Sequence, residues 1–268
     1  MKLAVVGHVE WIEFLRVESV PRPGEIVGAR ETWEEPAGGG GVAAVELARL
    51  AGECSLYCVL GADELGTQAR GELEAASVRV LAPEADDEIQ RRGFVYIDDA
   101  GERTITVIGE KSRPKGGEGT LPWEGLDDVD GVYFTAGDVE AVRQARRARV
   151  LVATARELPT LLAAGVELDA LVASGEDDAE RYQSGDLDPA PKLVVSTAGS
   201  LGGWAQPGGP YKPAVPPGPF EDAYGAGDCF AAGLTYALAK GMDVSDALTF
   251  ASERGALALT RRGAGLKD

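Results

Sequence analysis

Histidine and cysteine are scarce in this chain of 268 residues, which holds one histidine, His8, and three cysteines. A single histidine excludes zinc sites built from several histidines, and it makes any serine–histidine–acid triad depend wholly on His8. The motif G-x-x-x-x-G-K-[ST] is also absent from the sequence, which excludes a P-loop protein. Cys54 and Cys58 lie on one predicted strand, where they cannot pair, so we expect a reduced, cytoplasmic protein.

Positive charge is scarce as well, because 26 Lys and Arg residues stand against 44 Asp and Glu residues and leave a formal net charge of −18. This balance argues against nucleic acid or an anionic membrane surface as a partner. It does not exclude a small anionic ligand, whose site needs only local donors. No apolar run approaches the roughly 20 residues that span a bilayer. The start, "MKLAVVGHVE", lacks the architecture of a signal peptide.

Short apolar runs recur along the chain and are typical of strands buried on both faces of a parallel sheet. They occupy residues 3–7, 56–60, 131–135, 149–153, 168–173 and 192–196. Helical patterns lie between several of them, as in residues 43–50 and 141–148. This alternation predicts an α/β fold with a doubly wound, mainly parallel sheet flanked by helices, formed by residues 1–268 as a single domain.

Two segments interrupt the alternation of strands and helices. Residues 11–33 are predicted to be extended on both sides of a Pro- and Gly-rich turn, and residues 92–109 to form a hairpin around a turn at residues 99–101. Together they would make a small β lid outside the main sheet; the alternative is two surface hairpins with no role in closure. The Gly- and Pro-rich stretches 113–122 and 206–219 are predicted to be loops.

The first glycine-rich stretch is "AGGGGVAAVELARL", residues 37–50. Gly39, Gly41 and Ala44 satisfy the pattern G-x-G-x-x-A, which is a dinucleotide-binding fingerprint. That fingerprint should directly follow the first strand, whereas about 30 residues separate Gly7 from these glycines. The alternative is that the glycines let a ligand lie close to the backbone at the start of a helix.

A second stretch of small residues, "YGAGDCF", precedes an apolar helical pattern at Phe230, Leu234 and Ala237. The first N–H groups of that helix have no intrahelical partner, and the helix dipole adds partial positive charge there. Small residues let a phosphate approach these donors, so we expect an anion site. Asp228, in the first turn, is a candidate for the base that accepts a proton from an attacking hydroxyl. The alternative is an acidic residue that only complements the dipole.

At this stretch the sequence resembles the ribokinase-like (PfkB) carbohydrate kinases. Residues 222–230, "DAYGAGDCF", match six of the seven fixed positions of a family signature that reads approximately D-T-x-G-A-G-D-x-F. Other segments resemble further family features in the same order along the chain. Residues 38–50 with 61–66 resemble the first glycine signature, and residues 98–104 resemble the lid hairpin. Residues 196–203 resemble the nucleotide loop, and residues 250–264 resemble the helix and loop over the adenine. The resemblance covers nearly the full length and implies a ribokinase-like fold with a β lid.

The same resemblance implies catalytic roles around the second glycine stretch. Asp228 would be the base that activates the acceptor hydroxyl, and the backbone amides of Gly225, Ala226 and Gly227 would form the anion hole. Asp222 would help to order this loop, beside a candidate site for a monovalent cation.

On the donor side, the resemblance implies that Thr197, Gly199 and Gly202 border the nucleotide, ATP. The family's N-x-x-E motif, whose acid holds a magnesium-bound water, corresponds to Ser174 and Asp177 in this sequence. Both named residues are replaced, and Asp177 is then the candidate that holds Mg²⁺ through water.

The acceptor side departs from the family pattern. Family members usually carry an Asp just after the first strand and an Asn after the glycines, which grip sugar hydroxyls; Ile12 and Val42 stand at these positions. Neither side chain can hydrogen-bond, so the acceptor preference should be relaxed or redirected. The remaining candidates for contact with the substrate are Glu10, Gly39, Gly40 and Gly41.

Three functions therefore stay open on the sequence. The first is an ATP-dependent kinase that phosphorylates a hydroxyl of a sugar or sugar-like molecule, a nucleoside included. The second is a non-catalytic nucleotide- or small-molecule-binding protein on the same scaffold, motivated by the replaced residues on both sides of the site. The third is a nicotinamide-dependent enzyme, motivated by the glycine fingerprint alone. A homodimer through the lid is predicted beside a monomer, because an open lid has unpaired edges.

Overall fold

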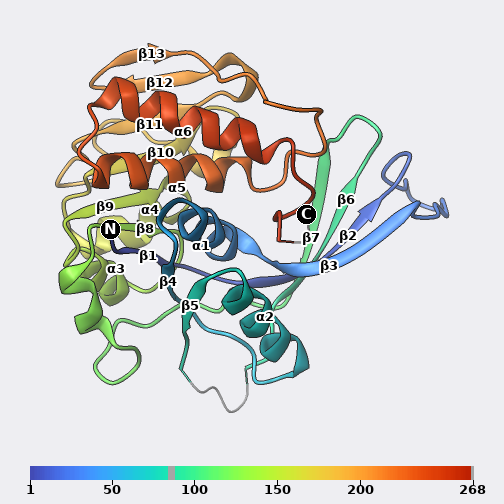
Figure 1. The fold of residues 1–268 in the computed structure, drawn as a ribbon, viewed down its shortest axis with the longest axis horizontal. Coiled ribbons are helices and arrows are strands. Elements are labelled where there is room, and N and C mark those ends of the chain that lie inside the picture. Colours follow the sequence, from blue (N-terminus) through green and yellow to red (C-terminus); the bar gives the residue numbers. More distant parts are fainter. Residues whose placement is uncertain (84–87, 267–268) are drawn as a thin grey trace.

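The structure is a computed structural model that describes residues 1–83 and 88–266. Within them, the larger sheet has nine strands in the order β13-β12-β11-β10-β9-β8-β1-β4-β5 (Figure 1). Its strand pairs are parallel except for β11 with β12 and β12 with β13. The strands are β1 (Leu3–Val6), β4 (Cys54–Tyr57), β5 (Val78–Leu81), β8 (Gly131–Phe134), β9 (Val150–Thr154), β10 (Ala170–Ser174), β11 (Val194–Thr197), β12 (Gly203–Gln206) and β13 (Gly209–Tyr211).

Alternate residues of the buried strands face two different layers of helices. In β1, Leu3 and Val5 belong to an apolar core that includes residues of α1, α2, α5 and α6. Ala4 and Val6 belong to a second core that includes residues of α3 and α4. The predicted doubly wound α/β fold is therefore confirmed. The helices are α1 (Gly38–Ala51), α2 (Glu64–Ala75), α3 (Val139–Ala145), α4 (Leu158–Ala164), α5 (Ala226–Ala239) and α6 (Val244–Ala258).

One predicted loop is partly wrong. Residues 206–219 were expected to lack regular structure, yet β13 lies within them and pairs antiparallel with β12. The chain reverses through a tight turn at Pro207 and Gly208, and Pro and Gly in sequence are also typical of an unstructured loop. The single domain was predicted to span residues 1–268, of which positions 84–87 and 267–268 lie outside the described residues.

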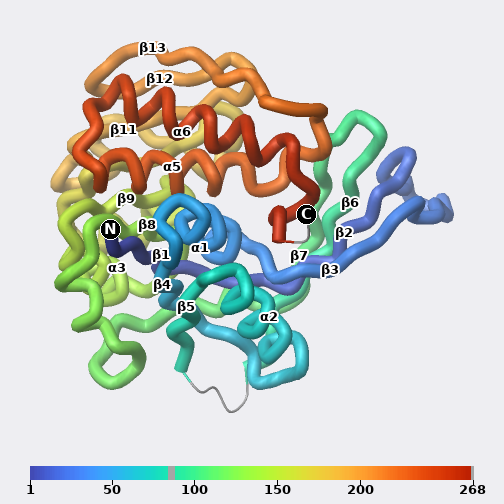
Figure 2. Tube along the Cα trace, viewed as in Figure 1, coloured from blue at the N-terminus to red at the C-terminus, as the bar shows by residue number. Residues whose placement is uncertain are grey.

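The lid is a second sheet of four strands in the order β3-β2-β6-β7. The predicted β lid is confirmed, but its first segment extends past the predicted end at residue 33, because β3 continues to Ala37. Its strands are β2 (Glu10–Arg16), β3 (Glu31–Ala37), β6 (Arg92–Ile97) and β7 (Arg103–Ile108). The Arg103 guanidinium donates a hydrogen bond of 2.7 Å to the Ala223 carbonyl, so the lid reaches the segment just before α5. The buried Glu35 carboxylate of β3 accepts from the backbone of Ala264 and Leu266, which holds the C-terminal end of the described chain beside the lid (Figure 2).

The order of the strands places one edge of the larger sheet at a topological switch point. From β1 the chain proceeds outward through β4 and β5 on one side, and then returns to β8 on the other side of β1. In open α/β sheets, ligands bind beyond the carboxyl ends of the strands at such a point. His8 follows β1 and Thr135 follows β8, so both stand at this place. Among the described residues, no helix combines the length and apolar character needed to cross a membrane.

Candidate active site

The start of α5 has the geometry of an anion site. Gly225 is the N-cap residue with φ of +73°, a left-handed conformation that favours glycine, and Ala226 begins the helix. Gly227 is exposed, and a side chain there would meet no atom within 4 Å. The first N–H groups of α5 have no intrahelical partner, and the space beside Gly227 is open, so the anion site stays a prediction that this geometry permits.

Two residues hold this loop in place. The buried Asp222 carboxylate accepts hydrogen bonds from the backbone N–H groups of Tyr224, at 2.8 Å, and Gly263, at 2.9 Å. Burial raises the pKa of Asp222, and these two bonds oppose the rise. The Tyr224 hydroxyl accepts a hydrogen bond of 3.2 Å from the Gly38 N–H, which ties the start of α5 to the start of α1. Sequence reasoning missed Tyr224, because the family signature leaves its position open.

The start of α1 lies against the same space. A Cβ atom on Gly39 would stand 3.0 Å from Asp228 Oδ1, 2.7 Å from Thr135 Oγ1 and 3.5 Å from the His8 ring. One on Gly40 would collide with the His8 backbone at 2.6 Å, whereas one on Gly41 would meet nothing within 4 Å. The glycines therefore bring α1 close to β1 and leave room beside Asp228. Two helix N-termini converge on this space, and both favour negative charge there.

Asp228 has the acidity that a general base requires. Burial raises the pKa of its carboxyl to about 6, and the negative charge of Glu180 adds to the rise. The positive charges of Arg103 and Arg156 oppose it. A carboxylate with this pKa is ionised at neutral pH, yet it is basic enough to accept a proton from a hydroxyl as that hydroxyl attacks.

Glu10 and His8 border the acceptor side. The buried Glu10 carboxylate lies 2.9 Å from Arg91 Nε and 3.7 Å from His8 Nε2. Burial raises the pKa of Glu10, while Arg91 and Lys111 act in the opposite direction. Burial also lowers the pKa of His8 well below its usual value, so the imidazole is neutral. The predicted candidate Glu10 thus lies beside the site, already paired with a cation.

The two residues that stand where family members carry their sugar-gripping Asp and Asn belong to an apolar core. Ile12 and Val42 are buried in a cluster with Phe14, Trp33 and Tyr224. A Cβ atom on Gly225 would lie 2.9 Å from Val42 Cγ1, so Val42 packs beneath the N-cap of α5. The apolar side chain of Val42 therefore supports the loop before α5 and offers no hydrogen bond to an acceptor.

The residues predicted to border the nucleotide lie at the carboxyl end of β11 and in the turn that leads to β12. Thr197 ends β11, and its hydroxyl donates to the Ala173 carbonyl. Gly199 follows in a short 3₁₀ turn, and a Cβ atom there would lie 3.3 Å from the Glu176 carboxylate. One on Gly202 would collide with the Tyr211 carbonyl, so Gly202 shapes the loop against β13.

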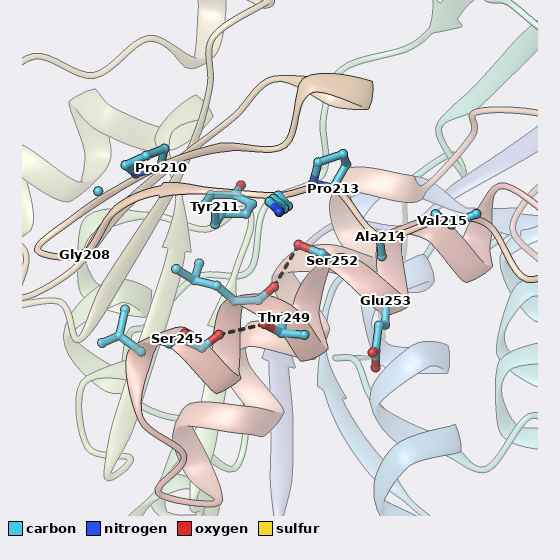
Figure 3. Close-up of a pocket in the computed structure, with 14 residues that line it drawn as sticks. Gly208, Pro210, Tyr211, Pro213, Ala214, Val215, Ser245, Thr249, Ser252 and Glu253 are labelled. Atoms are coloured by element: carbon cyan, nitrogen blue, oxygen red, sulfur yellow. Dashed lines mark hydrogen bonds between the residues drawn. The ribbon is translucent and has the colours of Figure 1, made fainter.

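A cavity of about 600 Å³ lies between β13 and α6, with the segment after β13 on one side (Figure 3). Thr249, Ser252 and Glu253 line it from α6, and Tyr211 and Val215 line it from the opposite segment. Hydroxyl-bearing and apolar side chains both line it. Gly202 approaches the backbone of Tyr211, one of the lining residues.

The candidate magnesium residue Asp177 is paired in this structure. Its carboxylate accepts a hydrogen bond of 2.6 Å from the Arg156 guanidinium and caps the following 3₁₀ turn. Within residues 1–83 and 88–266, no cluster of three or more His, Cys, Asp or Glu side chains is arranged to hold a metal ion. Mg²⁺ is usually bound through one or two carboxylates plus substrate phosphates, so Asp177 with neighbouring Glu176 fits such a site.

The dinucleotide-binding interpretation is wrong. The helix after the glycines, α1, follows lid strand β3, which pairs antiparallel with β2. A dinucleotide fingerprint instead requires a parallel strand, a turn and a helix in one βαβ unit.

An open helix start, a carboxylate of raised pKa and a glycine-rich helix start lie together at one edge of a doubly wound sheet, an arrangement that suits a phosphotransferase of the α/β class. The chain matches the family model described as pfkB family carbohydrate kinase over residues 1–155 and 142–268. The chain therefore belongs to this family, and the resemblance seen in the sequence is confirmed.

The similar proteins agree with this membership. An ATP-dependent ribose-1-phosphate kinase from Halopiger xanaduensis is 32% identical, over 98% of this chain and 94% of that protein. Ribokinase from Thermotoga maritima has a TM-score of 0.76 at 19% identity, over 99% of this chain and 95% of that one. Adenosine kinase from Sinorhizobium meliloti has a TM-score of 0.78 at 17% identity, over 98% and 95%. The predicted class, an ATP-dependent sugar or nucleoside kinase, is confirmed at this level.

Proposed function

We propose that this protein transfers the γ-phosphate of ATP to a hydroxyl of ribose-1-phosphate or a closely similar sugar phosphate. The name of the Halopiger relative supports this acceptor. One observation carries the reaction: Asp228, with a pKa of about 6, stands at the start of α5 and beside the glycines of α1. A hydroxyl held there meets a base and a phosphate-binding helix terminus together.

Each residue at the centre has a defined task in this reaction. The backbone N–H groups at Gly225, Ala226 and Gly227 stabilise the charge on the transferred phosphoryl group. Asp228 orients the acceptor hydroxyl and accepts its proton late, since the transition state of phosphoryl transfer is loose. Asp222 keeps the loop rigid through its two backbone hydrogen bonds.

The donor side is proposed to hold ATP with Mg²⁺. The loop at Thr197, Gly199 and Gly202 borders the phosphates, and the cavity beside α6 takes the base. Asp177 and Glu176 would hold Mg²⁺ through water. When bound, the ion would neutralise part of the negative charge on the phosphates. A monovalent cation beside Asp222 stays a prediction, to be checked by comparing turnover in potassium and in a bulky organic cation.

The experiment is an acceptor screen with ATP and Mg²⁺, in which ADP release is measured with ribose-1-phosphate, ribose and adenosine. We expect ribose-1-phosphate to give the highest kcat/KM. Adenosine as the best acceptor would favour the nucleoside kinase. ATP binding with no ADP release from any acceptor would favour the non-catalytic alternative and contradict the proposal.

Assembly and location are part of the proposal as well. Strand β7 is exposed along its length and carries Ile105, Val107 and Ile108, so a second copy of the chain would cover this edge of the lid. Light scattering at several concentrations distinguishes a homodimer from a monomer.

A cytoplasmic location is supported by the buried thiols of Cys54 and Cys58, which form no disulfide. If residues 1–268 form one domain, thermal unfolding in a calorimeter should show a single cooperative transition.

A further inference from the structure

Three cations gather at the base of the lid hairpin, in a chain whose net charge is −18. Arg91 stands immediately before β6, and Lys111 and Arg113 follow β7. Their side chains are 12%, 19% and 41% exposed, so the first two are largely withdrawn from water. Burying a charge is unfavourable unless something compensates it, so the cluster requires an explanation.

Two carboxylates compensate these cations incompletely. Arg91 Nε lies 2.9 Å from Glu10 Oε1. The buried Glu157 carboxylate lies 2.5 Å from Arg113 Nη1 and 3.6 Å from Lys111 Nζ, so one carboxylate serves two cations. Three positive and two negative charges leave one positive charge in excess. Burial lowers the pKa of Lys111, and the nearby charges of Arg113 and Arg91 also lower it.

The cluster faces the acceptor side of the active site. After burial, the charges of Lys111, Arg91 and Arg113 are the next causes that lower the pKa of His8. The His8 ring in turn stands beside the same Gly39 position that Asp228 approaches. The buried His8 Nδ1 has no hydrogen-bond partner among the described residues. Positive charge and an unpartnered polar atom thus border the space in front of the catalytic carboxylate.

We propose that Arg91, Lys111 and Arg113 form a subsite for the phosphate group that the acceptor already carries. This inference rests on the proposed kinase function and states how a phosphorylated sugar is recognised. Charge-assisted hydrogen bonds to phosphate are strong, and Arg binds phosphate through two parallel donors. Recognition by charge takes the place of the hydroxyl clamp that Ile12 cannot supply.

The phosphates of ATP are a different candidate for the same cations, and the topology argues against it. The cluster follows lid strands and reaches His8 at β1, whereas the nucleotide loop follows β11, which lies four strands away in the sheet order β11-β10-β9-β8-β1. Arg156, which follows β9 between the two sides, already pairs with Asp177 and Glu180. The lid cluster therefore lies beside His8 and away from the nucleotide loop.

The test uses the variants Lys111→Met and Arg113→Gln, with Lys192→Met as the matched control. Lys192 is an exposed cation just before β11, at the opposite edge of the sheet. For each variant we would measure the KM for ribose-1-phosphate, the KM for ATP and kcat/KM with ribose. Titration calorimetry with ribose-1-phosphate, in the absence of ATP, measures binding without turnover.

In Lys111→Met and Arg113→Gln we expect the KM and the dissociation constant for ribose-1-phosphate to rise by about tenfold to a hundredfold, because each variant loses one charge-assisted hydrogen bond to the phosphate. The KM for ATP and kcat/KM with ribose should stay within a few-fold of the wild type, as should every parameter of Lys192→Met. Inorganic phosphate should compete with ribose-1-phosphate in the wild type and lose this effect in the two variants.

Unchanged affinity for ribose-1-phosphate, or a rise in the KM for ATP alone, would overturn the subsite. The kinase proposal fails separately if the protein releases no ADP with any acceptor, while titration calorimetry still shows that the two variants bind ribose-1-phosphate more weakly than the wild type. The combination of the two readouts therefore tells which inference is wrong. Because both side chains lie at loop positions, a thermal unfolding scan of each variant shows whether the fold is intact.

Discussion

Replacing Asp228 by asparagine should give an enzyme that is more stable and almost inactive. The amide cannot accept the proton of the acceptor hydroxyl, and a positioned general base contributes about 10²- to 10⁴-fold to rate. We therefore expect kcat of Asp228→Asn to fall by about two to four orders of magnitude. The anion site itself uses backbone N–H groups, so nucleotide affinity should change little.

The stability effect follows from the pKa of the carboxyl. Its rise from the ordinary value of 3.8 to about 6 means that the charged form is disfavoured in the folded protein. At about 1.4 kcal/mol per pKa unit this is about 3 kcal/mol at neutral pH, and partial contact with solvent reduces it to about 1–2 kcal/mol. The neutral amide removes this unfavourable contribution, so the melting temperature of the variant should rise by a few degrees.

The sign of the pH dependence is determined by the same shift. Below pH 3.8 the carboxyl is protonated in the folded and unfolded chains, and it contributes nothing. As pH rises from 3.8 to about 6, the unfolded chain ionises first, and the wild type loses stability relative to the variant. Activity changes in the opposite sense, because kcat/KM of the wild type should fall about tenfold per unit below pH 6.

Three measurements check this reasoning: ADP release from ATP and ribose-1-phosphate, calorimetric titration of ATP, and thermal unfolding between pH 4 and pH 8. The matched control is Asp246→Asn, because Asp246 also lies in the first turn of a helix, α6, remote from the glycine loops. Wild-type turnover in Asp228→Asn would refute the role of the base. A lower melting temperature of this variant at pH 8 would refute the argument from burial.

Three further substitutions test the surroundings of the site. Gly225→Ala forces a side chain into a left-handed backbone conformation and against Val42 at 2.9 Å, so it should destabilise by about 1–3 kcal/mol and abolish ADP release. Glu46→Gln leaves the guanidinium groups of Arg254 and Arg261 without their buried carboxylate, so chemical denaturation should show a loss of about 3–5 kcal/mol. Ser252→Trp fills the cavity beside α6, so the KM for ATP should rise at least tenfold in the ADP-release assay while kcat is retained.

Each of these expectations has a result that contradicts it. Normal activity of Gly225→Ala would mean that the loop tolerates a different backbone conformation. An unchanged denaturation midpoint of Glu46→Gln would mean that the two arginines find water or other partners. An unchanged KM for ATP in Ser252→Trp would place the nucleotide base outside this cavity.

Much of the fold could be predicted from local patterns. The apolar runs at the strands, and the helical spacing of Phe230, Leu234 and Ala237, depend on neighbours in the sequence, so they predicted a doubly wound sheet and the start of α5. The hairpin of β12 and β13, residues 203–211, could not be separated from a loop, because both strands are short and a Pro-Gly turn joins them. Their pairing depends on the edge of a sheet that local sequence does not show.

The candidate site divides in the same way. Gly225, Ala226, Gly227 and Asp228 are consecutive, so the sequence alone placed them together at the start of a helix, and α5 begins there. That Val42 packs against Gly225 could not be predicted, because the contact joins two helix starts that are far apart in the sequence. Tyr224 was missed, because its hydrogen bond to Gly38 joins segments 186 residues apart.

By itself, the sequence determined the family and the donor chemistry of this protein: a glycine turn, an acidic residue and an apolar helix in order predict phosphoryl transfer. Only the tertiary structure decided the character of the acceptor side. In the sequence, nothing in the spacing of Arg91, Lys111 and Arg113 distinguishes them from other basic residues of a strongly acidic chain. They meet around Glu157 and Glu10 because the lid strands start and end beside β1. Long-range electrostatics is a property of distances in space, which the order of residues along the chain does not contain.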